Sequence, residues 1–380
     1  MFSIAILAVA LAAPAPSAPV VHGPRRTADR TPTYRFTSRE RGLPRAKIRF
    51  RCAFDSTRLH RCRPRHTPRL TLGRHVLRVQ AVDPAGRRSR MRKLVVRIVP
   101  PSPWRVRSIE VGGHPFSLAE AGGAIWVANF QSGRVQRIDP GSNRVVASVG
   151  VGGEPYGLAA GPGSIWVGNN AMDAVTRIDV ASNRVAARIP AGDRPIGLTY
   201  ADGSVWSADF GDGAIRRIDA ATNRVLATRV VPGQHEDVAV GFGSVWVPNE
   251  EGTVSRIDPA TLAATATIPV ALDPDFVAIA GGSVWTTAYR GNVISRIDPA
   301  TNAVAGRLPA AQGAQGFAFD TPGLWVANYD DGLLRLLDPA SGKVLKRWQL
   351  DGGARDVLVA AGSVWVANST STTVTRLTPR

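Results

Sequence analysis

The sequence is poor in several features that mark common protein classes. It contains two cysteines in 380 residues, and they match no recognised zinc-ligand spacing. Its N-terminal apolar run has about ten residues, which is too short to span a membrane, and no later stretch is a candidate. The paired glycines are not followed by predicted helices, so they are not phosphate-binding loops. These absences argue against an integral membrane protein and a nucleotide-binding enzyme.

Acidic residues are scarce in the first third of the chain. Residues 1–107 contain 25 Lys and Arg but only 4 Asp and Glu, a net charge of +21. Residues 108–380 contain 22 and 25, a net charge of −3. The total of +18 therefore comes from the N-terminal third, and a basic surface is expected there and not over the rest of the chain.

Tryptophan recurs at nearly constant spacing through the remaining two thirds. Seven residues are 39 or 40 positions apart: Trp126, Trp166, Trp206, Trp246, Trp285, Trp325 and Trp365. Each lies in a short block of alternating small and apolar residues, which is typical of a half-buried strand. Four short strands recur in every unit of about 40 residues. The pattern predicts an all-β fold with a seven-bladed β-propeller over residues 104–380, its tryptophans packed between blades.

The last repeat lacks a fourth strand. It ends at Arg380, soon after the predicted strand Thr373 to Leu377. The segment Trp104 to Val111 aligns with the fourth strands of other repeats and is followed by the same glycine-rich turn. A propeller with unpaired strand edges is open to pairing with other chains. We therefore expect this N-terminal strand to complete the seventh blade and close the ring.

Residues 1–19 resemble a secretory signal peptide. The apolar run from Ile4 to Ala13 is followed by small residues and prolines that offer cleavage sites, although no Lys or Arg precedes the run. The alternatives are a misassigned start and an anchor without lipid. On the first interpretation the mature chain is exported and extracytoplasmic, with no integral membrane span.

Residues 31–99 contain four alternating segments separated by turn residues, which predict a small β-sandwich. The segments are Thr33–Ser38, Ala46–Arg51, His75–Val82 and Leu94–Val99. The stretches Phe50-Arg51-Cys52 and Gly73-Arg74-His75 resemble those of bacterial extracellular Ig-like modules, and this likeness implies a disulfide between the two cysteines. A Pro-rich linker, residues 100–103, follows the module.

The two cysteines of this module allow two interpretations. Cys52 and Cys62 are separated by nine residues, and in an exported chain a disulfide is the simplest one. The alternative is a metal site, because His60 and His66 lie on either side of Cys62.

The arginines of the module are also open to two interpretations. They form either a solvated surface or a site that contacts an anionic polymer or cell surface through phosphate or carboxylate groups. Base-specific recognition of nucleic acid is disfavoured, because no set of aromatic residues alternates with the arginines.

The repeat sequence resembles a known family. Blocks such as Ile125-Trp126-Val127-Ala128-Asn129, Arg137-Ile138-Asp139-Pro140 and Glu154-Pro155-Tyr156-Gly157 are similar to those of YVTN-type and virginiamycin B lyase-like propellers, over about residues 104–380. The resemblance implies either binding or catalysis, since the second group contains a lyase that uses His and Glu with a bound Mg ion. Here no His follows the repeat proline, and no Glu lies three residues past a repeat tryptophan. The lyase pattern is therefore missing.

Two sets of loops are expected to share one face of the propeller around its central channel. They join one blade to the next, and the second strand to the third within a blade. An asparagine ring with neighbouring aromatic and acidic residues supplies the ligand-binding candidates on this face: Asn129, Phe130, Tyr156, Asn169, Asp209, Phe210, His235, Glu236, Asn249, Glu250, Asp275, Tyr289, Asn328 and Tyr329. Hydrogen bonding and stacking on a sugar or peptide suit this set better than bond cleavage.

The fourth repeat departs from the pattern, because the loop between its second and third strands is one residue short. Acidic residues gather near it in the predicted fold, and Asp209, Glu236 and Glu250 are candidate ligands for Ca or Mg. The alternative is that they are ordinary solvated loop residues. The Asp that ends each V-x-R-I-D block has a structural role instead, because it caps the turn that follows.

The sequence thus favours an exported, monomeric, non-enzymatic binding or scaffold protein. Its propeller face would bind a peptide, glycan or protein without a cofactor, and its basic module would contact an anionic surface or polymer. The alternatives are a divalent-cation-dependent lyase or hydrolase of the virginiamycin B lyase-like type, and a structural surface protein without a small ligand.

Overall fold

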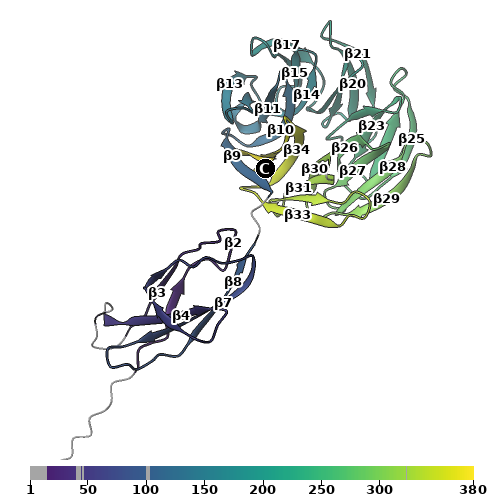
Figure 1. The fold of residues 1–380 in the computed structure, drawn as a ribbon. Coiled ribbons are helices and arrows are strands. Elements are labelled where there is room, and N and C mark those ends of the chain that lie inside the picture. The colour runs from purple at the N-terminus through teal and green to yellow at the C-terminus, as the bar shows by residue number, and fades with distance from the viewer. Residues whose placement is uncertain (1–14, 40–43, 45–46, 100–102, 322) are drawn as a thin grey trace, which may run out of the picture. The chain divides into compact units, whose positions relative to one another are not determined.

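The computed structural model describes residues 15–39, 44, 47–99, 103–321 and 323–380 (Figure 1). The chain divides into two compact units, residues 1–103 and 104–380, a boundary that coincides with the predicted start of the propeller. Residues 1–14 of the predicted signal peptide and 100–102 of the predicted linker lie outside the described residues. Within the described part of the chain, no helix is long and apolar enough to cross a membrane.

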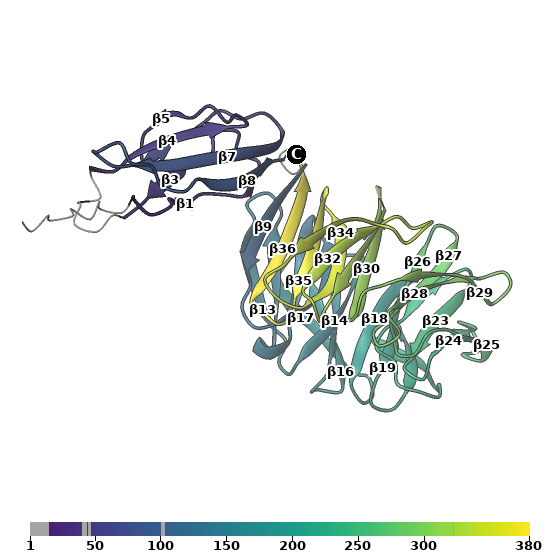
Figure 2. The same cartoon turned by 90° about the horizontal axis from the view of Figure 1, so that it is seen from below.

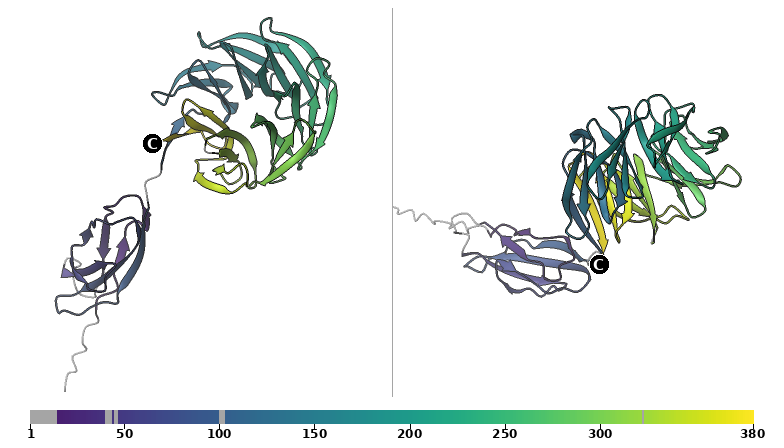
Figure 3. Two further views of the ribbon diagram at one scale, coloured as in Figure 1. Left: turned by 45° about the vertical axis from the view of Figure 1, so that its right-hand side comes forward. Right: turned by 90° about the horizontal axis from the view of Figure 1, so that it is seen from above.

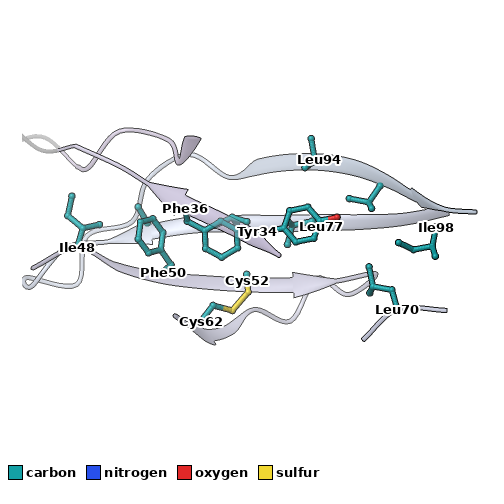
Figure 4. Packing of buried hydrophobic residues seen from close by; sticks show 13 residues of the cluster. Tyr34, Phe36, Ile48, Phe50, Cys52, Cys62, Leu70, Leu77, Leu94 and Ile98 are labelled. Carbon is teal, nitrogen blue, oxygen red and sulfur yellow. A yellow bond between two sulfur atoms is a disulfide. The ribbon is translucent and has the colours of Figure 1, made fainter. Parts of the chain in front are cut away.

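The N-terminal unit consists of two β-sheets. The first has the strand order β1 (Val20–His22), β3 (Tyr34–Thr37), β6 (Arg65–His66). The second has the order β2 (Arg26–Thr27), β8 (Arg92–Ile98), β7 (Gly73–Val82), β4 (Arg49–Phe54), β5 (His60–Cys62), and only the β2–β8 pair is parallel. Side chains of both sheets form one buried cluster, in which the rings of Phe36 and Phe50 lie 5.8 Å apart (Figure 4).

One predicted strand of this unit was wrong. The segment expected at residues 46–51 runs from Arg49 to Phe54, whereas the other three lie within two residues of their predicted ends. Phe50 and Cys52 point into the core, and the strand continues past them because it pairs with β7 as far as Phe54. The turn signal that was expected after Arg51 therefore comes three residues later.

The disulfide between Cys52 and Cys62 is confirmed. It joins β4 to β5, with the two Cα atoms 5.8 Å apart. Cys52 and Cys62 lie close to His60, and these three form the one group among the described residues with metal-ligand spacing. Since both sulfurs are bonded to each other, no thiolate is available there, and the zinc alternative is wrong.

The described residues of the second unit form seven four-stranded antiparallel sheets. In chain order, sheet 1 contains β10 (Pro115–Ala121), β11 (Ala124–Asn129), β12 (Arg134–Asp139) and β13 (Arg144–Gly150); sheet 2 contains β14 (Pro155–Gly161), β15 (Ser164–Asn169), β16 (Ala174–Asp179) and β17 (Arg184–Pro190); sheet 3 contains β18 (Pro195–Ala201), β19 (Ser204–Asp209), β20 (Ala214–Asp219) and β21 (Arg224–Val230). A 3-10 turn, η2 (Phe130–Ser132), follows β11.

The remaining sheets follow the same plan. Sheet 4 contains β22 (Ala239–Gly241), β23 (Ser244–Asn249), β24 (Thr253–Ile257) and β25 (Ala264–Pro269); sheet 5 contains β26 (Pro274–Ala280), β27 (Ser283–Ala288), β28 (Val293–Asp298) and β29 (Ala303–Pro309); sheet 6 contains β30 (Ala314–Asp320), β31 (Gly323–Asn328), β32 (Leu333–Leu337) and β33 (Val344–Gln349); sheet 7 contains β34 (Ala354–Ala360), β35 (Ser363–Asn368), β36 (Thr373–Pro379) and β9 (Trp104–Glu110). The one-residue deletion of the fourth repeat lies between β23 and β24, as predicted.

The sheets stand around a common centre in a propeller-like arrangement (Figures 1, 2 and 3). The first strand of each sheet lies nearest the centre, and the fourth lies at the rim. Sheet 7 combines both ends of the unit, because β9 pairs with β36 from Trp104 opposite Pro379 to Glu110 opposite Thr373. The strand that was expected to complete the last repeat is therefore in that place.

Each repeat tryptophan packs against the next sheet. Trp126 of sheet 1 shares a buried cluster with Ile165 and Val167 of sheet 2, and the pattern repeats around the unit. In the last cluster Trp365 of sheet 7 packs with Ile125 of sheet 1. All seven tryptophans are at most 5% exposed, so each junction buries a large apolar surface.

An arginine covers most of these tryptophans and links the same two sheets. The guanidinium of Arg137 lies 5.6 Å from the ring centre of Trp126, and its Nη1 donates to Asn183 Oδ1 at 3.1 Å in the next repeat. Asn183 has a φ of 54°, a left-handed conformation that Asn adopts at low cost. Sheet 6 departs from this rule, because Leu336 pairs with Trp325 and the rings of Trp104 and Trp348 pack on that tryptophan instead.

The Asp that ends each V-x-R-I-D block caps the next turn, as predicted. Asp139 accepts from the backbone N–H of Gly141 at 3.1 Å and of Ser142 at 2.9 Å. These hydrogen bonds lower the pKa of Asp139, and the corresponding side chains behave alike: Asp179, Asp219, Asp258 and Asp338. These carboxylates therefore serve as hydrogen-bond acceptors within the turns and not as ligand contacts.

The junction between sheets 7 and 1 gives a test of ring closure. We expect Trp365→Ala to destabilise the protein by about 3 to 5 kcal/mol, as large-to-small changes of a buried tryptophan do. The matched control is Trp206→Ala, at the junction of sheets 3 and 4 within the continuous chain. Urea unfolding followed by circular dichroism would compare them, and a much smaller cost for Trp365→Ala would show that the ends of the unit do not hold together.

Candidate functional site

The site is built on a bulge at the start of the first strand of each sheet. In sheet 1 the pairing register jumps between Pro115 and Ser117, and sheets 2, 3, 5, 6 and 7 have the same irregularity. In sheet 4, β22 begins only at Ala239. Bulges re-aim side chains and are frequent beside binding sites. Here they place one residue per repeat, the axial position, near the centre: Phe116, Tyr156, Ile196, Glu236, Asp275, Gln315 and Arg355.

One half of the axial ring is aromatic and apolar. Phe116 stacks on Phe130 with ring centres 4.6 Å apart, and Tyr156 meets Phe116 edge-on at 5.0 Å. The guanidinium of Arg355 lies 4.6 Å from the ring centre of Phe116 and 4.7 Å from that of Tyr156. The rings therefore hold the cation of Arg355 by a cation–π interaction that burial strengthens.

The other half is a connected polar network. Nη2 of Arg355 donates to Glu236 Oε2 at 3.1 Å and also to the Tyr156 hydroxyl, which in turn donates to Glu236 Oε2 at 2.9 Å. Nη1 of Arg355 donates to Gln315 Oε1 at 3.2 Å, and Nε2 of Gln315 donates to Asp275 Oδ2 at 3.0 Å. These five side chains come from sheets 2, 4, 5, 6 and 7, so the network fixes one arrangement of the ring.

The pKa values of the two carboxyl groups of this network are shifted in opposite directions. Burial, and then the negative charge of Glu236, raise the pKa of Asp275 well above its ordinary value. Burial also acts to raise the pKa of Glu236, but Arg355 and the hydrogen bonds from Asp275 and Tyr156 outweigh it and lower that pKa. These opposite shifts favour a neutral Asp275 beside an ionised Glu236, and the ion pair with Arg355 balances the charge of Glu236.

A second ring lies one residue further along each first strand. Asp237 Oδ2 accepts from the backbone N–H of Val277 in the next sheet at 2.9 Å, and Asp356 Oδ2 accepts from that of Leu118 at 2.8 Å. Gly157 fills the equivalent place in sheet 2, where a Cβ atom would lie 2.0 Å from the carbonyl oxygen of the neighbouring repeat. Burial raises the pKa of Asp237 to about 7 and also raises that of Asp356.

Two cavities border the axial ring. The first, of about 210 Å³, is lined by both rings, including Phe116, Tyr156, Glu236, Asp237, Phe276 and Arg355. The second, of about 190 Å³, is lined by Glu236, Glu250, Asp273, Asp275, Tyr289 and Gln315, with two neighbours. Glu236 borders both cavities. Since pockets for drug-sized ligands measure roughly 300 to 1,000 Å³, each cavity fits one small group of a ligand.

The structure corrects the interpretation of the asparagine ring. Its side chains are at most 3% exposed and hold the framework: Asn129, Asn169, Asn249 and Asn328. Asn169 Nδ2 donates to the carbonyl of Gly152 at 2.7 Å, which fastens the loop before β14 to the end of β15. The two predicted sets of loops do share one face, because Pro155 is paired with Asn169 and five of the other six sheets have the equivalent pair. The amides of this ring, however, line neither axial cavity.

Only two of the three candidate cation ligands are brought together, because Glu236 and Glu250 line the second cavity and Asp209 does not. Asp209 is fully buried and forms an ion pair with Arg216 and a hydrogen bond with Ser207. Glu236 is bonded within the axial network, and Glu250 lines the second cavity only. Among the described residues no carboxylate group has metal-ligand spacing. The structure therefore does not support a Ca or Mg site that uses all three residues.

Of the remaining ligand-binding candidates, some hold the protein framework and others line a cavity. Both ring nitrogens of His235 face carbonyl oxygens, of Val231 at 3.0 Å and Pro248 at 3.2 Å, so this buried side chain holds the loop before β22. Phe210 lies under the guanidinium of Arg194 at 4.8 Å and lines neither axial cavity. Tyr289 lines the second cavity and donates to Asp330 at 2.7 Å, and the ring of Tyr329 lies 6.5 Å away.

Several residues of the site were not selected from the sequence. They are Phe116, Asp237, Phe276, Gln315, Arg355 and Asp356. The signal that identifies them is their repeat position, since all lie one or two residues after the repeat proline or its replacement. Selecting only Tyr156, Glu236 and Asp275 from this position left out their shared partner, Arg355.

The comparisons with known proteins show the fold alone. No family model matches the chain, and no curated protein matches it. Hydrazine synthase of Kuenenia stuttgartiensis is similar in structure, with a TM-score of 0.62 and 17% identity, over 70% of this chain and 95% of that one. The computationally designed Ika8 protein has a TM-score of 0.56 and 13% identity, over 80% of this chain and 93% of its own. Likeness at this identity carries no function.

The half-buried carboxyl of Asp237 predicts a pH dependence of stability. Its pKa is raised to about 7 in the folded chain from 3.8, so folding takes up a proton between these values. The stabilisation is complete below pH 4 and is lost as pH rises to 7, by up to about 1.4 kcal/mol per pH unit. Asp237→Asn keeps the acceptor for Val277 and should remove this component.

Thermal unfolding at pH 5 and pH 8 checks the expectation. The difference between wild type and Asp237→Asn isolates this carboxyl from Asp275 and Asp356, which titrate in both proteins. Asp202→Asn, at an exposed turn, is the control. If Asp237→Asn retains the wild-type pH dependence, then Asp237 is not protonated on folding.

Proposed function

We propose that residues 104–380 form a closed seven-bladed β-propeller and that residues 31–99 are an Ig-like sandwich of an exported binding protein. The packing of sheet 7 on sheet 1 and the β9–β36 pairing support closure. The disulfide supports export, because such bonds persist in oxidising compartments. The likeness to YVTN-type and virginiamycin B lyase-like repeats remains part of this proposal and rests on the repeat sequence.

The observation that carries the binding function is the contrast between two repeat positions. The interior position holds tryptophan in all seven repeats, whereas the axial position holds seven different residues. Packing explains the first, because each tryptophan fills the same junction. Packing does not require the second, and burying the charges of Arg355 and Glu236 costs several kcal/mol per charge before their pairing offsets it. A position that is varied and charged at such cost is suited to recognition.

The chemistry of the site favours a ligand rich in hydrogen-bond donors. The donors of Arg355 and Gln315 are already directed at acceptors of the ring, whereas the carboxyl groups of Glu236, Asp237 and Glu250 border the cavities. Sugar hydroxyls or the amino groups of a peptide would supply donors, and Phe276 adds an apolar ring to the lining of the first cavity. We therefore propose that the axial site takes one sugar ring or one side chain of a glycan or peptide.

The N-terminal unit has a separate part in the proposal. Its excess of arginine supports contact with an anionic polymer or surface, which would hold the protein where the axial ligand is found. Contact of this kind needs no catalytic group. Binding at two sites strengthens retention of the protein, because the first contact raises the effective concentration of the second ligand.

A panel of sugars and short basic peptides tests the axial site on the full chain. A ligand that binds the folded state raises its melting temperature. For any ligand found, Glu236→Gln should weaken binding by about tenfold or more, since a charged hydrogen bond contributes roughly 1.5 to 3 kcal/mol. Glu154→Gln is the matched control, because Glu154 bonds Asn170 outside both cavities. Equal effects of the two changes, or no response to the panel, would overturn the proposal.

A further inference from the structure

One face of the N-terminal unit is almost wholly basic. In the five-stranded sheet the alternate residues His75, Leu77 and Val79 enter the core, so the residues between them face outward. The outward face of the five strands carries eight basic side chains, which we call the basic face: Arg26, Arg49, Arg51, Arg61, Arg74, Arg78, Lys93 and Arg97. These strands contain no Asp or Glu.

The pairing register places these charges side by side. Arg74 on β7 is directly opposite Arg97 on β8, which is in turn paired with Arg26 on β2. Two further like-charged pairs are Arg78 with Lys93 and Arg51 with Arg61. Like charges directly opposite each other destabilise a sheet. The arrangement therefore opposes folding. A bound anion would offset this repulsion.

The acidic residues of the unit do not neutralise this face. Among the described residues, Asp29 is bonded to Thr31, Asp55 pairs with His75, and Asp83 pairs with Arg87. No member of the basic face forms an ion pair with a carboxylate in the described part of the chain. The positive charge is thus available to a ligand.

A groove adjoins the basic face at the ends of β4 and β5. It has a volume of about 840 Å³, and four of its lining residues are Lys47, Arg49, Arg61 and Arg63. Arg49 and Arg61 belong to both the groove and the face, so a linear ligand can follow one continuous basic track. The face itself has Ala53, Val76, Gln80 and Val95 between the charges and no aromatic ring on which a base could stack.

The spacing of the positive charges on the basic face indicates which class of polymer fits it. Three cations in the row from Arg26 to Arg74 span two strand separations, about 10 Å. A matching polymer needs roughly one charge per 5 Å, a density that phosphate polymers reach, since one nucleic acid strand carries a charge per about 3.4 Å. Seven of the eight residues are Arg, whose planar fork binds phosphate oxygens in pairs.

We propose that the basic face and its groove bind a linear phosphate polymer through its phosphates. This rests on the proposed role of the N-terminal unit in contacting an anionic polymer, and it names the surface and the class of polymer. The polymer would offset the repulsion between neighbouring arginines, so binding should also stabilise this unit.

The test measures affinity of the full chain for inorganic polyphosphate at several NaCl concentrations. The face variant is Arg74→Gln, Lys93→Gln and Arg97→Gln together, and the control of equal charge is Arg35→Gln, Arg65→Gln and Arg69→Gln, on the other sheet and its loop. We expect the face variant to lose at least about tenfold in affinity and its salt slope to fall by about two to three. The control should change neither as much, and the face variant should melt no lower than wild type.

Each other outcome has a stated meaning. Equal losses in both variants would overturn the basic face while leaving contact with an anionic polymer intact. Failure of wild type to bind any polyanion would overturn both. Equal affinity for poly-L-glutamate of the same charge would overturn the preference for phosphate. Changing Arg74 and Arg97 to Lys keeps the charge, and unchanged affinity for polyphosphate would overturn paired recognition by Arg.

Discussion

The burial of one tryptophan at each junction between sheets is the interaction on which the rest of the second unit depends. A single four-stranded sheet leaves both faces exposed, and Trp126 or its equivalent covers a face of the next sheet. The guanidinium above the ring then binds the following repeat, so packing and hydrogen bonding join the same pair of sheets. Where Leu336 replaces that arginine, the rings of Trp104 and Trp348 pack on Trp325 in place of the guanidinium.

Because the tryptophan junctions hold the sheets together, the residues near the centre can differ from repeat to repeat. Since the junctions are secured away from the axis, the residue in each bulge is not needed to hold the sheets together, and seven different side chains occupy that position. The freedom is nevertheless limited by charge. Arg355 requires Glu236 nearby, and Asp275 requires a proton to remain beside Glu236. A change at one axial position therefore affects residues up to three sheets away.

Sequence reasoning was most successful where a feature recurs along the chain. The tryptophan spacing identified the seven sheets, and the likeness of Trp104 to Val111 to other fourth strands located the strand that pairs with β36. It failed where a polar side chain can point either into the protein framework or towards a ligand. Asn169 is polar and lies at a loop, but its amide turns inward to the carbonyl of Gly152. Asp209 is acidic, but its carboxylate forms an ion pair with Arg216, seven residues later in the chain. The axial network joins residues 40 to 199 positions apart, and only the arrangement of the sheets around a common centre brings Tyr156 to Glu236 and Arg355.

The two units use arginine in opposite ways, and this difference explains why the net charge of the whole chain describes neither of them. At the axial site of the second unit the cation is enclosed, since Arg355 is 7% exposed and balanced by Glu236. In the first, Arg74 and Arg97 face each other across two strands with no carboxylate between them. A buried, balanced cation orders its neighbours and responds weakly to salt, whereas an exposed row attracts counter-ions that a polymer can displace. Salt should therefore weaken binding at the basic face far more than binding at the axial site.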